Sequence, residues 1–247
     1  MYAQRRIRSF VLRAGRVTAA QERALTDLWP IFGLDFRNEP IDLDVAFGRR
    51  SAPGKAELDV AFGRRSAPGN ALRCLEIGFG AGEVIGALAE ANPDVDYLGI
   101  EVHRSGVGRL LLHANQTKLE NVRVVCHDAV EVLKESIRDD SFDEILVFFP
   151  DPWHKKRHHK RRLIDPGFVA LLADKMRSGG TLRLATDWQE YAEQMLAVCT
   201  ATPKLESLSP DGTYVVRPEF RPTTRFERRG TRLGHGVWDL AYRKRSI

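Results

Sequence analysis

The chain has 247 residues, of which 43% are hydrophobic and 29% are charged, so a wholly disordered protein is excluded and a sizeable core is available. Lysine and arginine number 38 against 33 aspartates and glutamates, which gives a formal net charge of +5. This excess is modest, so the placement of the positive charge matters more than its total. No apolar run approaches the ~20 residues that a membrane-spanning helix needs, and we expect no membrane contact.

The three cysteines, Cys74, Cys126 and Cys199, lie far apart and form no CxxC pair. This spacing excludes a disulfide scaffold and is typical of a protein in the reducing cytoplasm. Because their neighbours are apolar, we interpret them as ordinary buried thiols.

The N-terminus is basic, with arginines at positions 5, 6, 8, 13 and 16 and no acidic residue before Glu22. It lacks the apolar stretch of a secretory signal, although a transit peptide shares its composition. We favour a flexible basic arm that contacts a polyanion.

A tandem duplication lies between this arm and the rest of the chain: LDVAFGRRSAPG occupies 43–54 and recurs at 58–69. Two identical copies indicate a recent duplication, because solenoid repeats diverge and number at least three. We expect the second copy to keep the packing of this segment, since it continues into the first predicted strand, and one copy to be poorly ordered. The predicted boundaries are an arm over 1–71 and a domain over 72–247.

From residue 72 the pattern alternates between strand and helix. Predicted strands cover 72–77, 96–101, 122–126, 143–149 and 181–186, and predicted helices cover 83–91, 104–118, 129–137, 166–177 and 188–201. Continuous apolar strands alternating with helices predict a Rossmann-like α/β domain, with a doubly wound, mostly parallel, seven-stranded sheet. Strand signals near 213–217 and 237–243 predict that antiparallel pairing at the C-terminus completes this sheet.

The first predicted strand runs into LEIGFGAG (75–82), where Gly78, Gly80 and Gly82 allow a tight turn close to a ligand. The GxGxG spacing differs from the GxGxxG of dinucleotide binders. Glu76 would repel a pyrophosphate but attract a cationic ammonium group, which favours S-adenosylmethionine over NAD. A glycine-rich turn without a ligand is the alternative for such a motif alone.

Acidic residues follow the next two strands. Glu101 is placed to accept ribose hydroxyls, and Asp128 to meet the adenine amino group. Each alone is most often a loop carboxylate or a helix cap. With Glu76 they form three acids at the carboxyl edge of one sheet, where open α/β sheets bind ligands, and this predicts a cofactor site.

The fourth strand ends in FFPDPWHKKRHHKRR (148–162), in which Asp151 stands between two prolines that stiffen the turn. Trp153 offers a flat face for stacking a base. Six lysines and arginines follow within 155–162, and their position beside a predicted site favours phosphate contacts over a merely solvated face. His154, His158 and His159 lie among these cations, which would oppose a divalent ion, so we predict no metal.

From about residue 72 to 245 the chain closely resembles the bacterial tRNA (guanine-N7)-methyltransferases. The resemblance rests on LEIGFGAG, GIEVH, HDA, FPDPWHKKRHHKRR, ATDW and TTRFERRG followed by LGHGVWDL. The FPDPW stretch is specific to that family, whereas many methyltransferases share the glycine motif. The resemblance implies a class I S-adenosylmethionine-dependent fold and methylation of guanine-46 in the tRNA variable loop. The duplicated block is not part of the family pattern.

The resemblance also implies roles for individual residues. It implies cofactor contacts from Glu76, Gly78, Glu101, Asp128 and Asp151. It implies Asp151 as the catalytic residue, and tRNA contacts from Lys155, Arg157, His158, His159, Lys160, Arg161, Arg162, Asp187, Thr224, Arg225, Phe226 and Glu227. Arg225 stands where the family often has lysine. We expect tRNA as the partner and a monomer or homodimer.

The implied chemistry needs no base, because guanine N7 carries a lone pair and no proton. Orientation lowers the barrier, and carboxylates near the purine stabilise its developing positive charge. We expect Asp151 to supply this field and Asp187 to hold the guanine N1–H and N2–H edge, or else to cap the following helix.

Two classes of alternative remain at this point. A methyltransferase of the same fold could act on another RNA, a protein or a small molecule, although the basic run beside Asp151 argues against the last two. A non-catalytic RNA-binding protein is the other, and the three cofactor acids argue against it.

Overall fold

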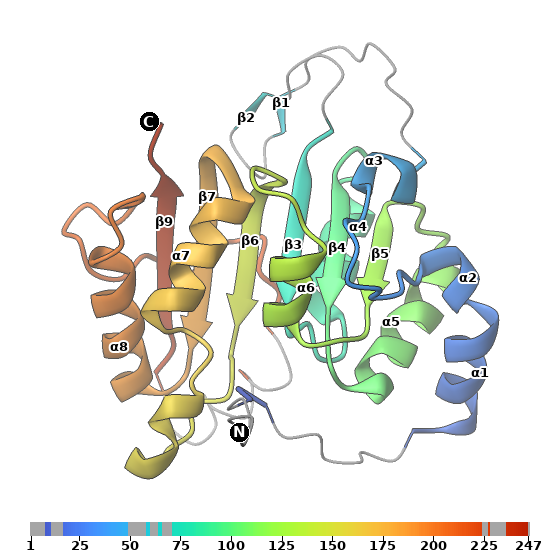
Figure 1. The fold of residues 1–247 in the computed structure, drawn as a ribbon, viewed down its shortest axis with the longest axis horizontal. Coiled ribbons are helices and arrows are strands. Elements are labelled where there is room, and N and C mark those ends of the chain that lie inside the picture. Colours follow the sequence, from blue (N-terminus) through green and yellow to red (C-terminus); the bar gives the residue numbers. More distant parts are fainter. Residues whose placement is uncertain are drawn as a thin grey trace, which may run out of the picture.

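A seven-stranded sheet of order β5-β4-β3-β6-β7-β9-β8 forms the centre of the computed structural model (Figure 1). The structure describes residues 8–10, 17–48, 58–59, 64–65, 71–223, 227 and 236–246. The strands of this sheet are β3 (Arg73–Ile77), β4 (Asp96–Ile100), β5 (Val122–Val125), β6 (Phe142–Phe148), β7 (Met176–Thr186), β8 (Leu205–Ser207) and β9 (Trp238–Lys244). The pairs β5–β4, β4–β3, β3–β6 and β6–β7 are parallel, whereas β9 runs antiparallel to both β7 and β8. The predicted α/β sheet is confirmed.

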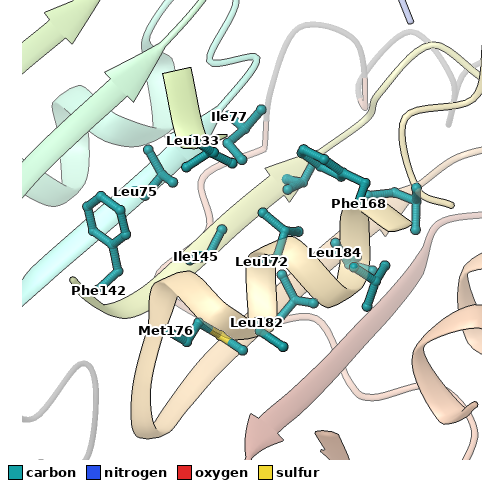
Figure 2. Close-up of a cluster of buried hydrophobic side chains, with 14 of the residues drawn as sticks. Leu75, Ile77, Leu133, Phe142, Ile145, Phe168, Leu172, Met176, Leu182 and Leu184 are labelled. Atoms are coloured by element: carbon teal, nitrogen blue, oxygen red, sulfur yellow. The ribbon is translucent and has the colours of Figure 1, made fainter. Parts of the chain in front are cut away.

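Helices cover both faces of the sheet because each crossover between parallel strands carries one. They are α4 (Glu83–Ala91), α5 (Arg104–Thr117), α6 (Ala129–Glu135), α7 (Pro166–Lys175) and α8 (Gln189–Thr200). One buried cluster joins α4 and α5 to the sheet, and the other joins α6, α7 and α8 to the opposite face. Figure 2 shows the second cluster, where Leu172 of α7 packs on Ile145 of β6 and Leu182 of β7.

The edge strand was placed wrongly by the sequence analysis. A strand was expected near 213–217, but there only Val215 pairs, in an isolated bridge with Asp239. The sheet ends instead with Leu205–Ser207, a three-residue strand whose letters carry no alternating pattern. Such a strand is held by pairing with β9 and not by its own propensity.

Residues 17–48, which lie within the predicted arm over 1–71, form three helices that pack against the domain. They are α1 (Ala19–Asp27), α2 (Trp29–Phe32) and α3 (Leu43–Ala46). Thr18 and Gln21 form a reciprocal capping box at the start of α1, and Ala24 and Phe32 are buried in the cluster that includes α5. These helices were not predicted from the sequence.

The described residues of the first copy of the duplicated segment pack on the core, a role that we had expected of the second copy. Leu43 and Phe47 are buried, and Asp44 forms an ion pair with Arg73 of β3. Arg123 of β5 donates to the carbonyl oxygen of Ala46 at 2.7 Å and lies over the Phe47 ring. The second copy contributes the short antiparallel pair β1 (Leu58–Asp59) and β2 (Arg64–Arg65). We also expected one of the two copies to be poorly ordered. Most of the residues that this expectation concerns lie outside the described part of the chain.

Among the described residues, no helix has the length and apolarity that crossing a bilayer requires.

Candidate active site

A cavity of about 560 Å³ opens at the carboxyl edge of the sheet, beside the switch point between β3 and β6 where the strand order reverses. In Figure 1 this is the lower edge of the sheet. The predicted residues that line the cavity are Gly78, Glu101, Asp128, Asp151 and Asp187, which come from the ends of β3, β4, β5, β6 and β7. Residues more than a hundred positions apart therefore meet at one wall, as the strand order predicts.

The glycine-rich turn after β3 forms one side of this cavity. Gly78 has φ +72° and Gly80 has φ +56°, a left-handed conformation that glycine adopts without strain. A Cβ added at either position would meet nothing within 4 Å, so both face open space. Bare backbone is therefore presented to the cavity, where a ligand can approach it closely.

Glu101 joins this turn to the turn after β4. Its Oε2 accepts a hydrogen bond from the backbone N–H of Gly80 at 2.8 Å. Its Oε1 accepts from the backbone N–H groups of Val102 at 2.7 Å and His103 at 3.0 Å. Because a carboxylate has about four acceptor positions, these bonds fix its orientation and leave capacity for a ligand hydroxyl.

Glu76 is buried two residues before Gly78 and is not part of the cavity wall. Burial raises the pKa of its carboxyl to about 8, with Glu101 adding to the rise and a hydrogen bond from the Ile85 backbone opposing it. Its Oε2 has no hydrogen-bond partner among the described residues. A buried carboxyl oxygen without a partner is costly, and a ligand ammonium group would supply the missing donor.

Asp128 serves as the N-cap of α6, where its Oδ1 accepts from the backbone N–H of Val130 at 2.9 Å. Its side chain also lines the cavity. We had treated capping of the helix and contact with a ligand as alternative roles for Asp128, and the structure allows both. Oδ1 caps α6, and Oδ2 can accept a hydrogen bond from a ligand in the cavity.

Asp151 is exposed at the cavity, in the turn that follows β6. Phe149 has φ +52°, an uncommon conformation for a residue with a side chain, and its N–H donates to the carbonyl oxygen of Ala185 in β7 at 2.8 Å. Pro150 and Pro152 also line the cavity. The surrounding structure therefore holds the backbone that presents Asp151.

Asp187 is half-buried and lines the same cavity, directly after β7. The alternative that Asp187 caps α8 is wrong, because the N-cap is Trp188 and no side chain caps this helix. The Trp188 ring instead meets His154 edge-on, with centroids 4.1 Å apart.

The basic segment after Asp151 forms the short 3-10 helix η1 (Lys156–Arg161). Lys155, Arg157 and Lys160 are exposed, whereas His158, His159 and Arg161 are half-buried. The structure thus leaves Lys155, Lys156, Arg157 and Lys160 open to solvent beside the cavity.

Arg162 differs from its neighbours because it is buried, with 4% of its surface exposed. Its Nε donates to the carbonyl oxygen of Pro152 at 2.9 Å, and its Nη1 donates to Gln194 of α8 at 2.7 Å. The guanidinium also lies over the Tyr191 ring. Arg162 therefore fastens the basic segment to α8.

Trp153 does not line the cavity, although we expected its face to stack on a base. The Arg161 guanidinium lies 5.0 Å from the centre of the Trp153 ring. The Nε1–H of Trp153 donates to the carbonyl oxygen of Ser9 at 3.0 Å.

Of the predicted segment 224–227, the structure describes only Glu227. This residue is buried and absent from the cavity wall, and its Oε2 accepts from Arg221 Nη1 at 2.8 Å. Thr224, Arg225 and Phe226 lie outside the described residues.

Several residues of the cavity wall were not predicted from the sequence to belong to the site: Ser9, Phe10, His103, His127, His154 and Trp188. His154 and Trp188 adjoin predicted residues, so their proximity was a usable signal. Ser9 and Phe10 offered none, because only the fold brings them to positions so distant in the chain. Among the described residues, no group of three histidine, cysteine or acidic side chains could hold a metal ion.

Comparison with known proteins agrees with this geometry. A family model described as "Putative methyltransferase" matches residues 70–240. The chain is 48% identical over 243 residues to a tRNA (guanine-N(7)-)-methyltransferase of Methylobacillus flagellatus, covering 98% of this chain and 93% of that protein. It is 52% identical over 242 residues to the protein of the same name from Paraburkholderia xenovorans, covering 98% and 85%.

Among solved structures, the 16S rRNA methyltransferase KamB superposes with a TM-score of 0.53 at 15% identity, covering 71% of this chain and 88% of that chain. The cyclase SpnF gives 0.51 at 16% identity, covering 72% and 76%. At these identities the similarity establishes the fold alone.

Proposed function

This chain belongs to the tRNA (guanine-N(7)-)-methyltransferase family, and we propose that it transfers a methyl group from S-adenosylmethionine to guanine N7 in tRNA. One observation carries the proposal. The turn of chain after β6 holds an exposed carboxylate at the cavity, Asp151, and continues directly into the exposed cations of η1. A site for a cationic reaction centre thus adjoins a surface for a phosphate backbone.

The acidic residues fit the cofactor, which supplies a sulfonium methyl group when bound. Glu76 lies behind the cavity wall and has a buried oxygen without a donor among the described residues, and we assign the ammonium group of the methionine part to it. Glu101 and Asp128 each keep acceptor capacity at the cavity, for ribose hydroxyls and the adenine amino group respectively. Gly78 leaves room for close approach to the backbone.

For the guanine, the same wall offers Asp151 and Asp187 from the ends of neighbouring strands. Asp187 accepts hydrogen bonds from the N1–H and N2–H edge, which turns N7 towards the methyl group. Asp151 places a negative charge near the purine as it becomes cationic, so it stabilises the transition state more than the ground state. No proton has to leave N7, and neither residue acts as a general base.

For the tRNA backbone, we assign phosphate contacts to the exposed or half-buried members of the basic segment: Lys155, Arg157, His158, His159, Lys160 and Arg161. Arg162 supports this surface from behind, because its guanidinium is already used by Pro152 and Gln194. Thr224, Arg225 and Phe226 complete the substrate site in this proposal. The expected target is guanine-46 of the variable loop, and tRNA as substrate favours the cytoplasm; monomer or homodimer stays a prediction.

The test is incubation with labelled S-adenosylmethionine and tRNA that lacks modifications, followed by digestion and identification of the labelled nucleoside. We expect 7-methylguanosine. Label in protein, in small molecules or in another base would overturn the proposal, and binding of tRNA without any transfer would favour a non-catalytic RNA-binding protein.

A pair of variants ties the activity to the site. Asp151→Asn keeps the shape of the side chain but removes its charge, and we expect methyl transfer to fall about 100-fold. The matched control is Asp94→Asn, because Asp94 is exposed in the loop before β4, at the opposite edge of the sheet. Turnover of Asp151→Asn within about twofold of wild type would remove the electrostatic role.

A further inference from the structure

Arg221 is the most completely buried charged side chain of the described residues, at 0% exposure, and it does not line the cavity. It lies in the connection between β8 and β9. Its Nη1 donates to Glu227 Oε2 at 2.8 Å and its Nη2 donates to Asp239 Oδ2 at 2.9 Å. A buried guanidinium needs such partners, but core packing alone would be served equally well by an apolar side chain.

The same guanidinium lies over two aromatic rings, one at the end of β6 and one in the turn that presents Asp151. Its central carbon lies 5.5 Å from the centre of the Phe148 ring and 5.3 Å from that of Phe149. Phe149 has the left-handed backbone described above, and such a conformation persists only where its surroundings hold it. Stacking by Arg221 is one of the contacts that hold it.

The two carboxylates connect Arg221 to the other predicted parts of the substrate site. Glu227 directly follows Thr224, Arg225 and Phe226, for which we propose tRNA contact, and is itself buried. Asp239 of β9 pairs in register with Ala185 of β7, two residues before Asp187. Arg221 therefore contacts Phe149 in the turn before Asp151 and also contacts Glu227. Through Asp239 it is connected to the end of β7, which leads to Asp187.

We propose that Arg221 is a positioning residue, which fixes the substrate segment at Glu227 relative to the Asp151 turn. It acts through Glu227, Phe149 and Asp239 and not by touching the substrate. A guanidinium is required, because it donates to two carboxylates through separate nitrogens while its central carbon lies over two aromatic rings, and the smaller ammonium group of lysine cannot do both. The inference rests on the proposed function for its kinetic consequences, but its structural consequence can be measured without any substrate.

The first test measures hydrogen exchange of the backbone amides over 146–153 in Arg221→Lys. We expect faster exchange there, including at Phe149, whose N–H bonds to Ala185. The matched control is Arg177→Lys, which alters a partly buried pair with Asp143 (2.7 Å) near the start of β7. Unchanged exchange over 146–153 in Arg221→Lys, or an equal increase in both variants, would overturn the proposal.

The second test is kinetic. With saturating S-adenosylmethionine and tRNA, Arg221→Lys should lose about tenfold or more in methyl transfer while its cofactor Kd stays within about twofold of wild type. Equal losses of rate in Arg221→Lys and Arg177→Lys would indicate a merely structural role. Wild-type protein in the same assay separates the two ideas: its failure to methylate tRNA refutes the proposed function, whereas the exchange result still decides the role of Arg221.

A double-mutant cycle tests the route through Glu227. If Arg221 acts through it, Arg221→Lys combined with Glu227→Gln should lose no more activity than the more damaging single change. Independent, additive losses would contradict the proposal. Should Arg221→Lys not fold, Glu227→Gln alone keeps the pair between Arg221 and Asp239, and faster exchange over 146–153 is again the expected result; unchanged exchange would refute the link.

Discussion

The Oε2 atom of Glu101 accepts a hydrogen bond from the backbone N–H of Gly80 at 2.8 Å, so one carboxylate joins the turns after β3 and β4. The same carboxylate holds two further N–H groups at the start of the segment leading to α5. Its conformation is therefore set by the protein before any ligand arrives. A preorganised acceptor of this kind binds a hydroxyl without further ordering of the side chain.

Glu101→Ala should weaken S-adenosylmethionine binding by about 1–3 kcal/mol, because a buried acceptor is removed and its backbone donors are left unpaired. The measurement is titration calorimetry. Glu193→Ala, an exposed position on α8, is the control and should bind normally. An unchanged Kd for Glu101→Ala would remove this residue from the cofactor site.

Glu76 should make stability depend on pH. Its pKa in the folded protein is about 8, above the ordinary value of 4.5, so the folded state keeps a proton that the unfolded state releases. The stability of the wild type should therefore fall as pH rises from about 4.5 to about 8, by up to about 1.4 kcal/mol per pH unit from this group.

Glu76→Gln removes this titration. The Tm of the variant minus that of wild type should increase between about pH 5 and about pH 8, then level off. Saturating S-adenosylmethionine should suppress the wild-type decline, because its ammonium group stabilises the ionised carboxylate. A difference in Tm that stays constant with pH would contradict the prediction.

The basic segment should divide into RNA-binding and structural arginines. Arg157→Ala combined with Lys160→Ala should weaken tRNA binding and reduce the slope of log K against log salt by about 0.7–0.9 for each phosphate that is no longer neutralised. Both residues are exposed, so Tm and cofactor affinity should stay unchanged.

Arg162→Ala is the contrasting variant. It should lower Tm, because it breaks the hydrogen bonds to Pro152 and Gln194 inside the protein. If Arg162→Ala flattened the salt slope at unchanged Tm, the division drawn here would be incorrect.

The docked copy of the duplicated segment should be Leu43–Phe47. Leu43→Ala should destabilise the protein by about 2–4 kcal/mol, since Leu43 is buried in the core. Leu58→Ala, at the equivalent position of the second copy, should leave the free energy of unfolding unchanged. Equal effects in chemical denaturation would mean that both copies occupy the docking site.

Deletion of 43–57 should preserve stability and tRNA methylation. It gives the same chain as deletion of 55–69, so a single LDVAFGRRSAPG block follows Asp42 in either description. Asp42 caps α3 through the N–H of Val45 at 3.1 Å, and that cap is retained. The entropy of closing a connection varies only slowly with its length. Loss of soluble protein would show that the added block supports the fold.

Much of the site could be predicted because its residues follow strands in the sequence. Apolar runs at 72–77, 96–101 and 143–149 identified the strands, and parallel strands bring their carboxyl ends to one edge. Glu101, Asp128 and Asp151 at the cavity follow from this logic alone. The sequence did not show which side chains are free to bind. Arg162 has the same charge as Lys160 and Arg161, and Glu227 stands in a segment that resembles a substrate-binding motif, yet both are buried and bonded inside the protein.

The duplicated segment shows that local sequence alone does not determine secondary structure in this chain. The letters LD begin the helix α3 at Leu43 and form the strand β1 at Leu58, within identical twelve-residue blocks. Periodicity and propensity predicted a mostly parallel sheet with acidic residues at its carboxyl edge. They are the same for both copies of the block, so they could not choose between them. Tertiary contacts stabilise the helix in the first copy. Arg73 pairs with Asp44, Arg123 donates to the Ala46 carbonyl oxygen, and Leu43 and Phe47 are buried in the core. Burial of two large apolar side chains outweighs the small conformational preference of so short a segment.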